Sequence, residues 1–216
     1  NGNNTVSVGN NTMTFNTLLE GFYSGETITV TDAYSNASSL TIPDFTIDTT
    51  APTAAITYDS TGPYKNGDTV TITATFNEAM ADSSVPRIAI NGSGTLLSLG
   101  ATNMTKSSDT LYTYSYSVPI GTGTGTISLS TGTDLAGNVI ISTPTSGATF
   151  NVDNTAPVLL EIVPIPERTK VNTPTYVFQS DEAGQITVGH ASANALNTGF
   201  TPTVVTEGQE NQNISL

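Results

Sequence analysis

Cysteine, tryptophan and long apolar runs are absent from this chain of 216 residues, and histidine occurs once. Without cysteine there can be no disulfide, no thiolate metal site and no cysteine nucleophile. His190 has no second histidine or cysteine with which to hold zinc, so we expect an ordinary strand residue there. No stretch of about 18 apolar residues predicts a transmembrane helix. The chain begins with Asn1 and no signal peptide, so we expect a processed form or a segment of a longer protein.

Positive charge is also scarce. Five lysines and arginines face 18 aspartates and glutamates, which gives a formal net charge of -13. Nucleic-acid binding needs a cluster of basic residues, and here only Arg168 and Lys170 lie close together, so nucleic acid is not expected as a partner. An acidic surface attracts cations through its long-range field. Divalent cations are therefore the ligands to consider first.

The composition that remains favours strands and turns. Threonine is frequent in strands and asparagine and glycine in turns, whereas strong helix formers are few. Residues 68–76 alternate apolar side chains with threonine, the pattern of a strand buried on one face. Similar short runs, separated by turn residues, follow at 85–90, 96–99, 111–118, 126–129 and 149–152. The sequence predicts an all-β protein built from antiparallel β-sandwiches.

An internal repeat sets the length of the module. The segment Phe45–Pro52 recurs as Phe150–Pro157, and the offset of Asp153 from Asp48 is 153 − 48 = 105 residues. About 100 residues is the length of one immunoglobulin-like (Ig-like) sandwich. We therefore expect tandem Ig-like modules.

The repeat predicts three parts. Residues 51–155 form a complete sandwich, 1–50 the C-terminal part of one module and 156–216 the N-terminal part of another. Residues 11–15 also resemble 212–216, as though the chain started and stopped at the same point of a module. Two explanations stay open: these residues are a window of a longer array, or the end of one chain completes the module begun by its neighbour and builds a filament or lattice.

Acidic and amide side chains form the one group of residues that suggests a binding site. They recur in two sets at equivalent positions: Asp32, Asn36, Asp48 and Glu78, and Asp134, Asn138, Asp153 and Glu182. Calcium takes six to eight oxygen ligands, mostly carboxylates, carbonyls and water. We expect each set to meet at a module boundary, where a calcium ion would stiffen the joint and offset carboxylate repulsion.

A purely structural interpretation competes with the metal site. Asp and Asn close turns by accepting hydrogen bonds from nearby backbone, with no ion required. Asp181 is an additional candidate ligand, whereas Asp68 and Asp82 are expected to be turn residues. Both interpretations predict loops at these positions.

A row of tyrosines offers a second function. Tyr112, Tyr114 and Tyr116 lie two residues apart and share one face of a strand. Such a row could contact a glycan, but it packs more often on a neighbouring strand. No acid–base pair or nucleophile with an evident partner points to an enzyme.

Three segments resemble a known family: residues 60–80, 132–138 and 153–157 are similar to the prokaryotic Ig-like repeats of large cell-surface adhesins and surface-layer proteins. The resemblance covers essentially the whole chain. It implies an extracellular, mostly mechanical role: an extended spacer, a filament or a surface-layer building block, whose partners are neighbouring modules or other copies and whose joints often hold calcium. A carbohydrate-binding module of a secreted protein is the alternative. One departure is Tyr34-Ser35, which stands where the second copy has Ala136-Gly137.

Overall fold

The structure, a computed structural model, describes residues 6–172, 174–186, 204–205 and 212–215. In this part of the chain every regular element is a β-strand, and the strands form six antiparallel sheets. The predicted all-β class is confirmed. Nothing in the described ranges forms a helix of the length and apolarity needed to cross a membrane. The chain divides into two compact units, Asn1–Asn154 and Thr155–Leu216, and His190 lies outside the described residues.

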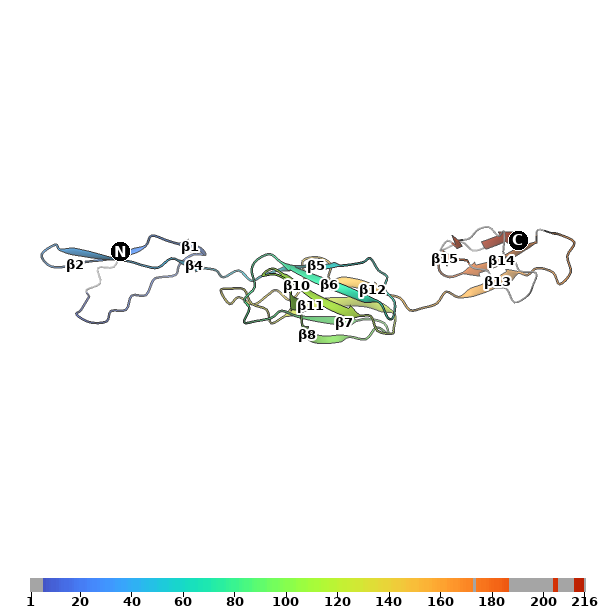
Figure 1. The fold of residues 1–216 in the computed structure, drawn as a ribbon, viewed down its shortest axis with the longest axis horizontal. Coiled ribbons are helices and arrows are strands. Elements are labelled where there is room, and N and C mark those ends of the chain that lie inside the picture. The colour runs from blue at the N-terminus through green and yellow to red at the C-terminus, as the bar shows by residue number, and fades with distance from the viewer. Residues whose placement is uncertain (1–5, 173, 187–203, 206–211, 216) are drawn as a thin grey trace. The chain divides into compact units, whose positions relative to one another are not determined.

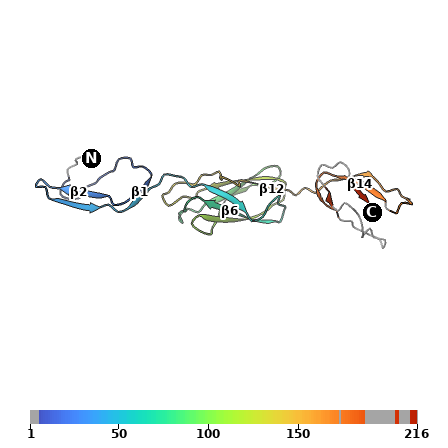
Figure 2. The ribbon, with the colours of Figure 1, turned by 90° about the horizontal axis from the view of Figure 1, so that it is seen from above.

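Residues 51–154, here called the central domain, contain two four-stranded sheets (Figure 1). The first sheet has, in spatial order, β5 (Ala54–Tyr58), β6 (Thr69–Phe76), β10 (Leu111–Ser117) and β9 (Thr105–Lys106). The second has β12 (Thr149–Val152), β11 (Gly123–Ser130), β7 (Arg87–Gly92) and β8 (Leu99–Asn103). From above, β6 and β12 can be followed along the domain (Figure 2).

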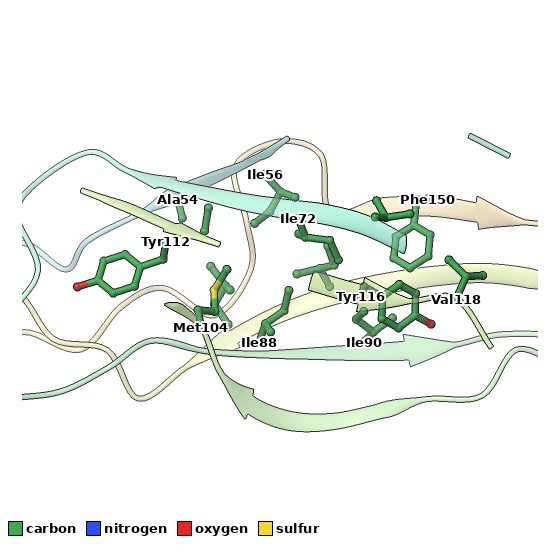
Figure 3. Packing of buried hydrophobic residues seen from close by; sticks show 14 of the residues in the cluster. Ala54, Ile56, Ile72, Ile88, Ile90, Met104, Tyr112, Tyr116, Val118 and Phe150 are labelled. Atoms are coloured by element: carbon green, nitrogen blue, oxygen red, sulfur yellow. The ribbon is translucent and has the colours of Figure 1, made fainter. Parts of the chain in front are cut away.

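One hydrophobic core lies between these two sheets, as Figure 3 shows from close by. Ile72 of β6 and Ile88 of β7 are both 0% exposed. The alternation predicted for residues 68–76 is borne out, since the apolar members of β6 are buried and the threonines between them are not. Burying one such side chain stabilises the fold by about 1.5–3 kcal/mol.

The tyrosine row belongs to this core. Tyr112 is 1% exposed and its ring meets Phe76 edge-on at 5.8 Å. Tyr116 is 4% exposed and contacts Phe150 in the same way at 5.6 Å, while Tyr114 is partly buried against the core. Aromatic rings that bind sugars must be exposed, so Tyr112 and Tyr116 offer no surface for a glycan.

The N-terminal strands of the first unit form two small ladders. One joins β1 (Gly21–Tyr23) to β4 (Phe45–Ile47), with Tyr23 stacked on Phe45 at 5.1 Å. The other is the hairpin of β2 (Thr27–Thr31) and β3 (Ala37–Thr41), which turns through Asp32 and Asn36. These strands are blue in Figure 1. Their side chains are mostly exposed, so this segment lacks a core like that of the central domain.

The second unit has a three-stranded sheet in the order β13 (Leu159–Val163), β14 (Thr175–Ser180) and β17 (Gln212–Ser215). Two further short strands, β15 (Gly184–Gln185) and β16 (Val204–Val205), pair with each other. Phe178 of β14 is buried at 7% exposure, whereas Leu159 and Leu160 of β13 are 63% and 57% exposed.

Candidate metal centre

Three carboxylates meet where the chain enters the central domain. Asp48, Glu78 and Asp134 each offer an oxygen, and these oxygens all lie within 4.8 Å of one another. Asp48 follows β4 and lies in the linker to β5, Glu78 follows β6, and Asp134 lies in the loop after β11. The cluster therefore draws one residue from the linker and two from the domain.

Strand direction explains why Glu78 and the linker are neighbours. Because β6 runs antiparallel to β5, with Phe76 opposite Ala54, the end of β6 lies beside the start of β5. Two hydrogen bonds fix this corner: the Thr53 N–H donates to Asn77 Oδ1 at 2.7 Å, and the Asn77 N–H donates to the Thr53 carbonyl at 3.0 Å. Glu78 is the next residue.

Strand direction also brings Asp134 to the end of the central domain where the linker enters. In the β11–β12 ladder Gly123 lies opposite Val152, so β11 ends far from the point where β12 leaves the domain. A β-bridge between Met80 and Asp134 then joins the loop after β11 to the segment after β6. The Asp134 loop thus returns to the entrance of the domain, not to its exit.

Asp134 is held by hydrogen bonds in a closed loop. It is 2% exposed, and its Oδ1 accepts the N–H groups of Gly137 at 2.7 Å and Asn138 at 2.9 Å. The Asn138 side-chain amide donates to Asp134 Oδ2 at 2.8 Å and to the backbone carbonyl of Asp48 at 3.1 Å. Asn138 therefore links the Asp134 loop to the linker between β4 and β5. The two sets of repeated residues in the sequence did not predict this contact.

The charges of the cluster act on one another. The pKa of Glu78 is raised above its ordinary value, first by burial and then by the negative charges of Asp48 and Asp134. Burial also works to raise the pKa of Asp134, but the hydrogen bonds from Asn138 and from the neighbouring backbone outweigh it and leave that pKa lowered. Asp134 is thus kept ionised beside Glu78, whose carboxyl resists ionisation. A cation would relieve this repulsion.

Glu20 is a nearby acid that the sequence did not single out. Its carboxylate accepts hydrogen bonds from the Thr49 hydroxyl at 3.4 Å and from the Thr50 hydroxyl, and its charge also helps to raise the pKa of Glu78. The β1–β4 register, with Gly21 opposite Ile47, brings Glu20 to the linker. Only the pairing of two three-residue strands could have revealed it.

The structure groups the predicted ligands differently from the sequence repeat. Asp134 and Asn138 of the second set meet Asp48 and Glu78 of the first. Asp32 and Asn36 instead close the β2–β3 turn, where the Asn36 amide donates to Asp32 Oδ2 at 2.9 Å. Equivalent positions in a repeat do not reveal which copies meet, because that depends on the end of the domain to which each loop returns.

The remaining candidates lie elsewhere. Asp153 follows β12, and its N–H donates to the Tyr64 carbonyl at 2.8 Å. Asp181 and Glu182 belong to the second unit, and Asp181 Oδ1 accepts the Val158 N–H at 2.7 Å.

Two acids were expected to be turn residues. Asp68 closes a turn by accepting the Lys65 N–H at 2.9 Å. Asp82 lies in a turn and forms an ion pair with Lys106, which also contacts Asp109 at 2.8 Å.

The donor set fits a hard divalent cation. Oxygen ligands of calcium lie about 2.3–2.6 Å from the ion, so two ligands on opposite sides of it are about 4.6–5.2 Å apart. The separations within the cluster, all within 4.8 Å, are compatible with one shared ion. All three groups are carboxylates, whereas zinc and copper sites usually include imidazole or thiolate.

The chain matches no protein-family model, no curated protein and no solved structure.

Proposed function

We propose that this chain is a structural repeat segment of a secreted cell-surface protein. In this proposal the central domain is an Ig-like sandwich module, and further modules of the same kind precede and follow it. Two four-stranded antiparallel sheets around one core, together with the 105-residue repeat, support this assignment. The role is mechanical: the modules form a spacer, a filament or a surface layer that carries adhesive or protective parts of a larger protein.

The acid cluster carries the functional part of the proposal. Asp48 lies in the linker, whereas Glu78 and Asp134 belong to the central domain. An ion bound by all three would tie the linker to the domain and restrict bending at the joint. The Asn138 bond to the Asp48 carbonyl already holds the linker on one side. Calcium is the favoured ion because it accepts several carboxylates in an irregular shell that water can complete.

The position of the cluster suits such a role. All three carboxylates lie at the point where the chain enters the domain, and two of them accept backbone hydrogen bonds: Asp48 from the Thr50 N–H and Asp134 from the Asn138 N–H. The acidic chain as a whole, with its net charge of -13, would also draw cations toward this joint.

Thermal unfolding with and without calcium tests the proposal. The melting temperature of the full chain should rise with calcium and fall on chelation, because an ion that binds only the folded state stabilises it by about 2.7 kcal/mol at a concentration 100 times its Kd. Magnesium should stabilise less, since it demands a stricter octahedral shell.

A pair of variants locates the effect. Glu78→Gln keeps the size of the side chain but removes one ligand charge, and should abolish the calcium-dependent shift. Asp82 is an acid of the same domain that lies outside the cluster and pairs with Lys106. The control variant Asp82→Asn should therefore retain the calcium-dependent shift in melting temperature. An identical melting temperature of the unaltered chain in calcium and in chelator would refute the metal joint.

A further inference from the structure

We propose that the central domain resists stretching of the chain through a parallel clamp, formed by its first segment, residues 54–64, and its last segment, residues 145–153. The proposal rests on the mechanical role proposed above, but not on calcium. It needs only that the chain continues on both sides of the domain, as it does through residues 1–50 and 155–216. A pull from the two sides then reaches both segments of the clamp directly.

The two segments of the clamp run side by side in the same direction. Ala55 and Ser146 form a parallel β-bridge, and Tyr64 and Val152 form a second one. The ladders between the named strands of the central domain are all antiparallel. Strands β5 and β12 lie at the edges of their two sheets, so the clamp joins an edge of one sheet to an edge of the other.

Backbone hydrogen bonds hold the clamp near the entrance of the domain. The Thr145 N–H donates to the Ala54 carbonyl at 2.8 Å, and the Thr145 hydroxyl donates to the same oxygen at 3.1 Å. The Ile56 N–H donates in the other direction, to the Ser146 carbonyl at 3.0 Å. Each segment therefore both donates to and accepts from the other.

A side chain extends this part of the clamp. The Tyr58 hydroxyl crosses to the other segment and donates to the Gly147 carbonyl at 2.6 Å. Gly147 has a positive φ, and its backbone lies so close to the Ile56 carbonyl that no side chain would fit there. Glycine at this position thus permits the close contact of the two segments.

A second group of hydrogen bonds lies near the exit. The Tyr64 N–H donates to the Asn151 carbonyl at 2.9 Å, and the Asp153 N–H donates to the Tyr64 carbonyl at 2.8 Å. Asn154, directly after the clamp, accepts the Asn66 N–H on its Oδ1 at 2.6 Å. The chain is therefore held by the domain up to the residue at which it leaves.

Aromatic packing opposes sliding between the two groups of hydrogen bonds. The ring of Phe150, in the last segment, contacts two rings of the first segment: Tyr58 at 5.8 Å and Tyr64 at 6.0 Å, both edge-on. Displacement of one segment along the other would break one of these contacts and force the Phe150 ring against the other tyrosine. Packing and hydrogen bonds thus resist the same movement.

The direction of the load decides how the clamp would fail. Residues 54–64 begin at the entrance, since Ala54 pairs with Phe76 at the end of β6. Residues 145–153 end at the exit, where Val152 pairs with Gly123 at the start of β11. A pull through the two linkers draws these parallel segments in opposite directions along their own axes. The hydrogen bonds and ring contacts are then loaded together, and forced unfolding is limited by the step that breaks them.

Single-molecule force spectroscopy of the full chain in chelator tests the inference. Because the chain has no cysteine, thiol handles can be placed at will. Ala51→Cys/Ala156→Cys places one handle on each side of the clamp and loads it along its axis. The 156 − 51 = 105 residues between the handles extend to about 350–380 Å, which identifies the unfolding of the central domain.

The control geometry peels the same clamp from one end. Ala51→Cys/Thr143→Cys attaches both handles just before the two segments, and Thr143 is exposed. Here the hydrogen bonds are loaded one after another, beginning at the entrance. At the same loading rate, the unfolding force should be several-fold lower than with the handles at 51 and 156. Equal forces in the two geometries would overturn the proposal.

Two tyrosine variants, made in the Ala51→Cys/Ala156→Cys background, test the clamp residue by residue. Tyr58→Phe removes the hydroxyl that crosses to Gly147, whereas Tyr64→Phe removes a hydroxyl that donates at the same distance, 2.6 Å, to the Ser60 carbonyl within its own segment. Tyr58→Phe should lower the unfolding force and Tyr64→Phe should not. Urea unfolding of both variants measures their equilibrium stability. Forces that fall only in proportion to that stability would show that the crossing bond bears no special load.

The outcomes distinguish this inference from the metal joint of the proposed function. Equal forces in the two geometries, together with a calcium-dependent melting shift, would remove the clamp and leave the joint standing. A higher force along the axis without any calcium effect on melting would support the clamp and refute the joint.

Discussion

At the scale of single residues, Glu78 connects the acid cluster to pH. Its pKa is raised above the ordinary value of 4.5 by burial and by the charges of Asp48 and Asp134. A carboxyl whose pKa is higher in the folded than in the unfolded state destabilises the fold when both states are ionised. That destabilisation is relieved as the pH falls through the raised pKa toward 4.5.

The first prediction follows from this sign. In chelator, the free energy of unfolding of the unaltered chain should receive a stabilising contribution as the pH is lowered from 7 toward 5, and Glu78→Gln should lack that contribution. Urea unfolding at several pH values measures both. A pH profile that Glu78→Gln leaves unchanged would show that Glu78 does not carry this repulsion.

Asn138 permits a second prediction with an internal control. Asn138→Ala removes the amide that donates to both Asp134 and the Asp48 carbonyl, so the buried Asp134 carboxylate and the partly buried Asp48 each lose a partner. The expected loss is about 1–3 kcal/mol of unfolding free energy. Asn36→Ala removes the same amide from the equivalent loop outside the central domain, and should leave unfolding of that domain unchanged. Equal effects of the two substitutions would contradict this interpretation.

At the scale of elements, two glycines allow the energetic cost of a steric clash to be distinguished from that of backbone strain. Gly147 has a φ of +66°, and a Cβ there would lie 2.1 Å from the Ile56 carbonyl oxygen. Gly67 has a φ of +90°, but a Cβ there would meet nothing within 4 Å. Residues with a side chain adopt this conformation at a cost of about 1–2 kcal/mol.

The third prediction compares these positions. Gly67→Ala should lower the unfolding free energy by about 1 kcal/mol, the cost of strain alone. Gly147→Ala should cost more, because β5 must also shift away from the segment that carries Gly147. Chemical denaturation of the two variants measures the difference, and equal losses would show that this close approach relaxes freely.

The elements show which parts of the structure the sequence could predict. The alternation of apolar residues and threonine in 68–76 predicted β6 correctly, because a strand with one buried face imposes that period. The tyrosine row was placed on one face of a strand, but only packing shows that this face is the buried one. The short ladder of β1 and β4 has no periodic signal, so the approach of Glu20 to the linker could not be predicted.

The acid cluster was predicted in composition but not in grouping. Asp48, Glu78, Asp134 and Asn138 were all identified from their repeated positions, since the acidic and amide residues recur at equivalent places in the two copies. Their meeting depends on the direction in which β11 leaves its sheet, which is a property of the fold and not of any local motif.

At the scale of the whole molecule, the fourth prediction concerns the linker after β4. If an ion ties Asp48 to the central domain, calcium should slow proteolytic cleavage at residues 49–52 relative to chelator. The core strands should resist cleavage in both conditions, because local opening there requires loss of the buried core. Mass spectrometry of the fragments locates the cut, and Glu78→Gln should be cleaved in calcium as rapidly as the unaltered chain in chelator.

Under the proposed function, the division of the cluster between linker and domain would have a mechanical consequence. A joint closed by a covalent bond has one stiffness, fixed when the protein is made. A joint closed by Asp48 on one side and Glu78 and Asp134 on the other would take its stiffness from the calcium activity of the surrounding fluid. Repeated along an array, such joints would let the persistence length of a surface fibre change reversibly with the ionic composition of its habitat.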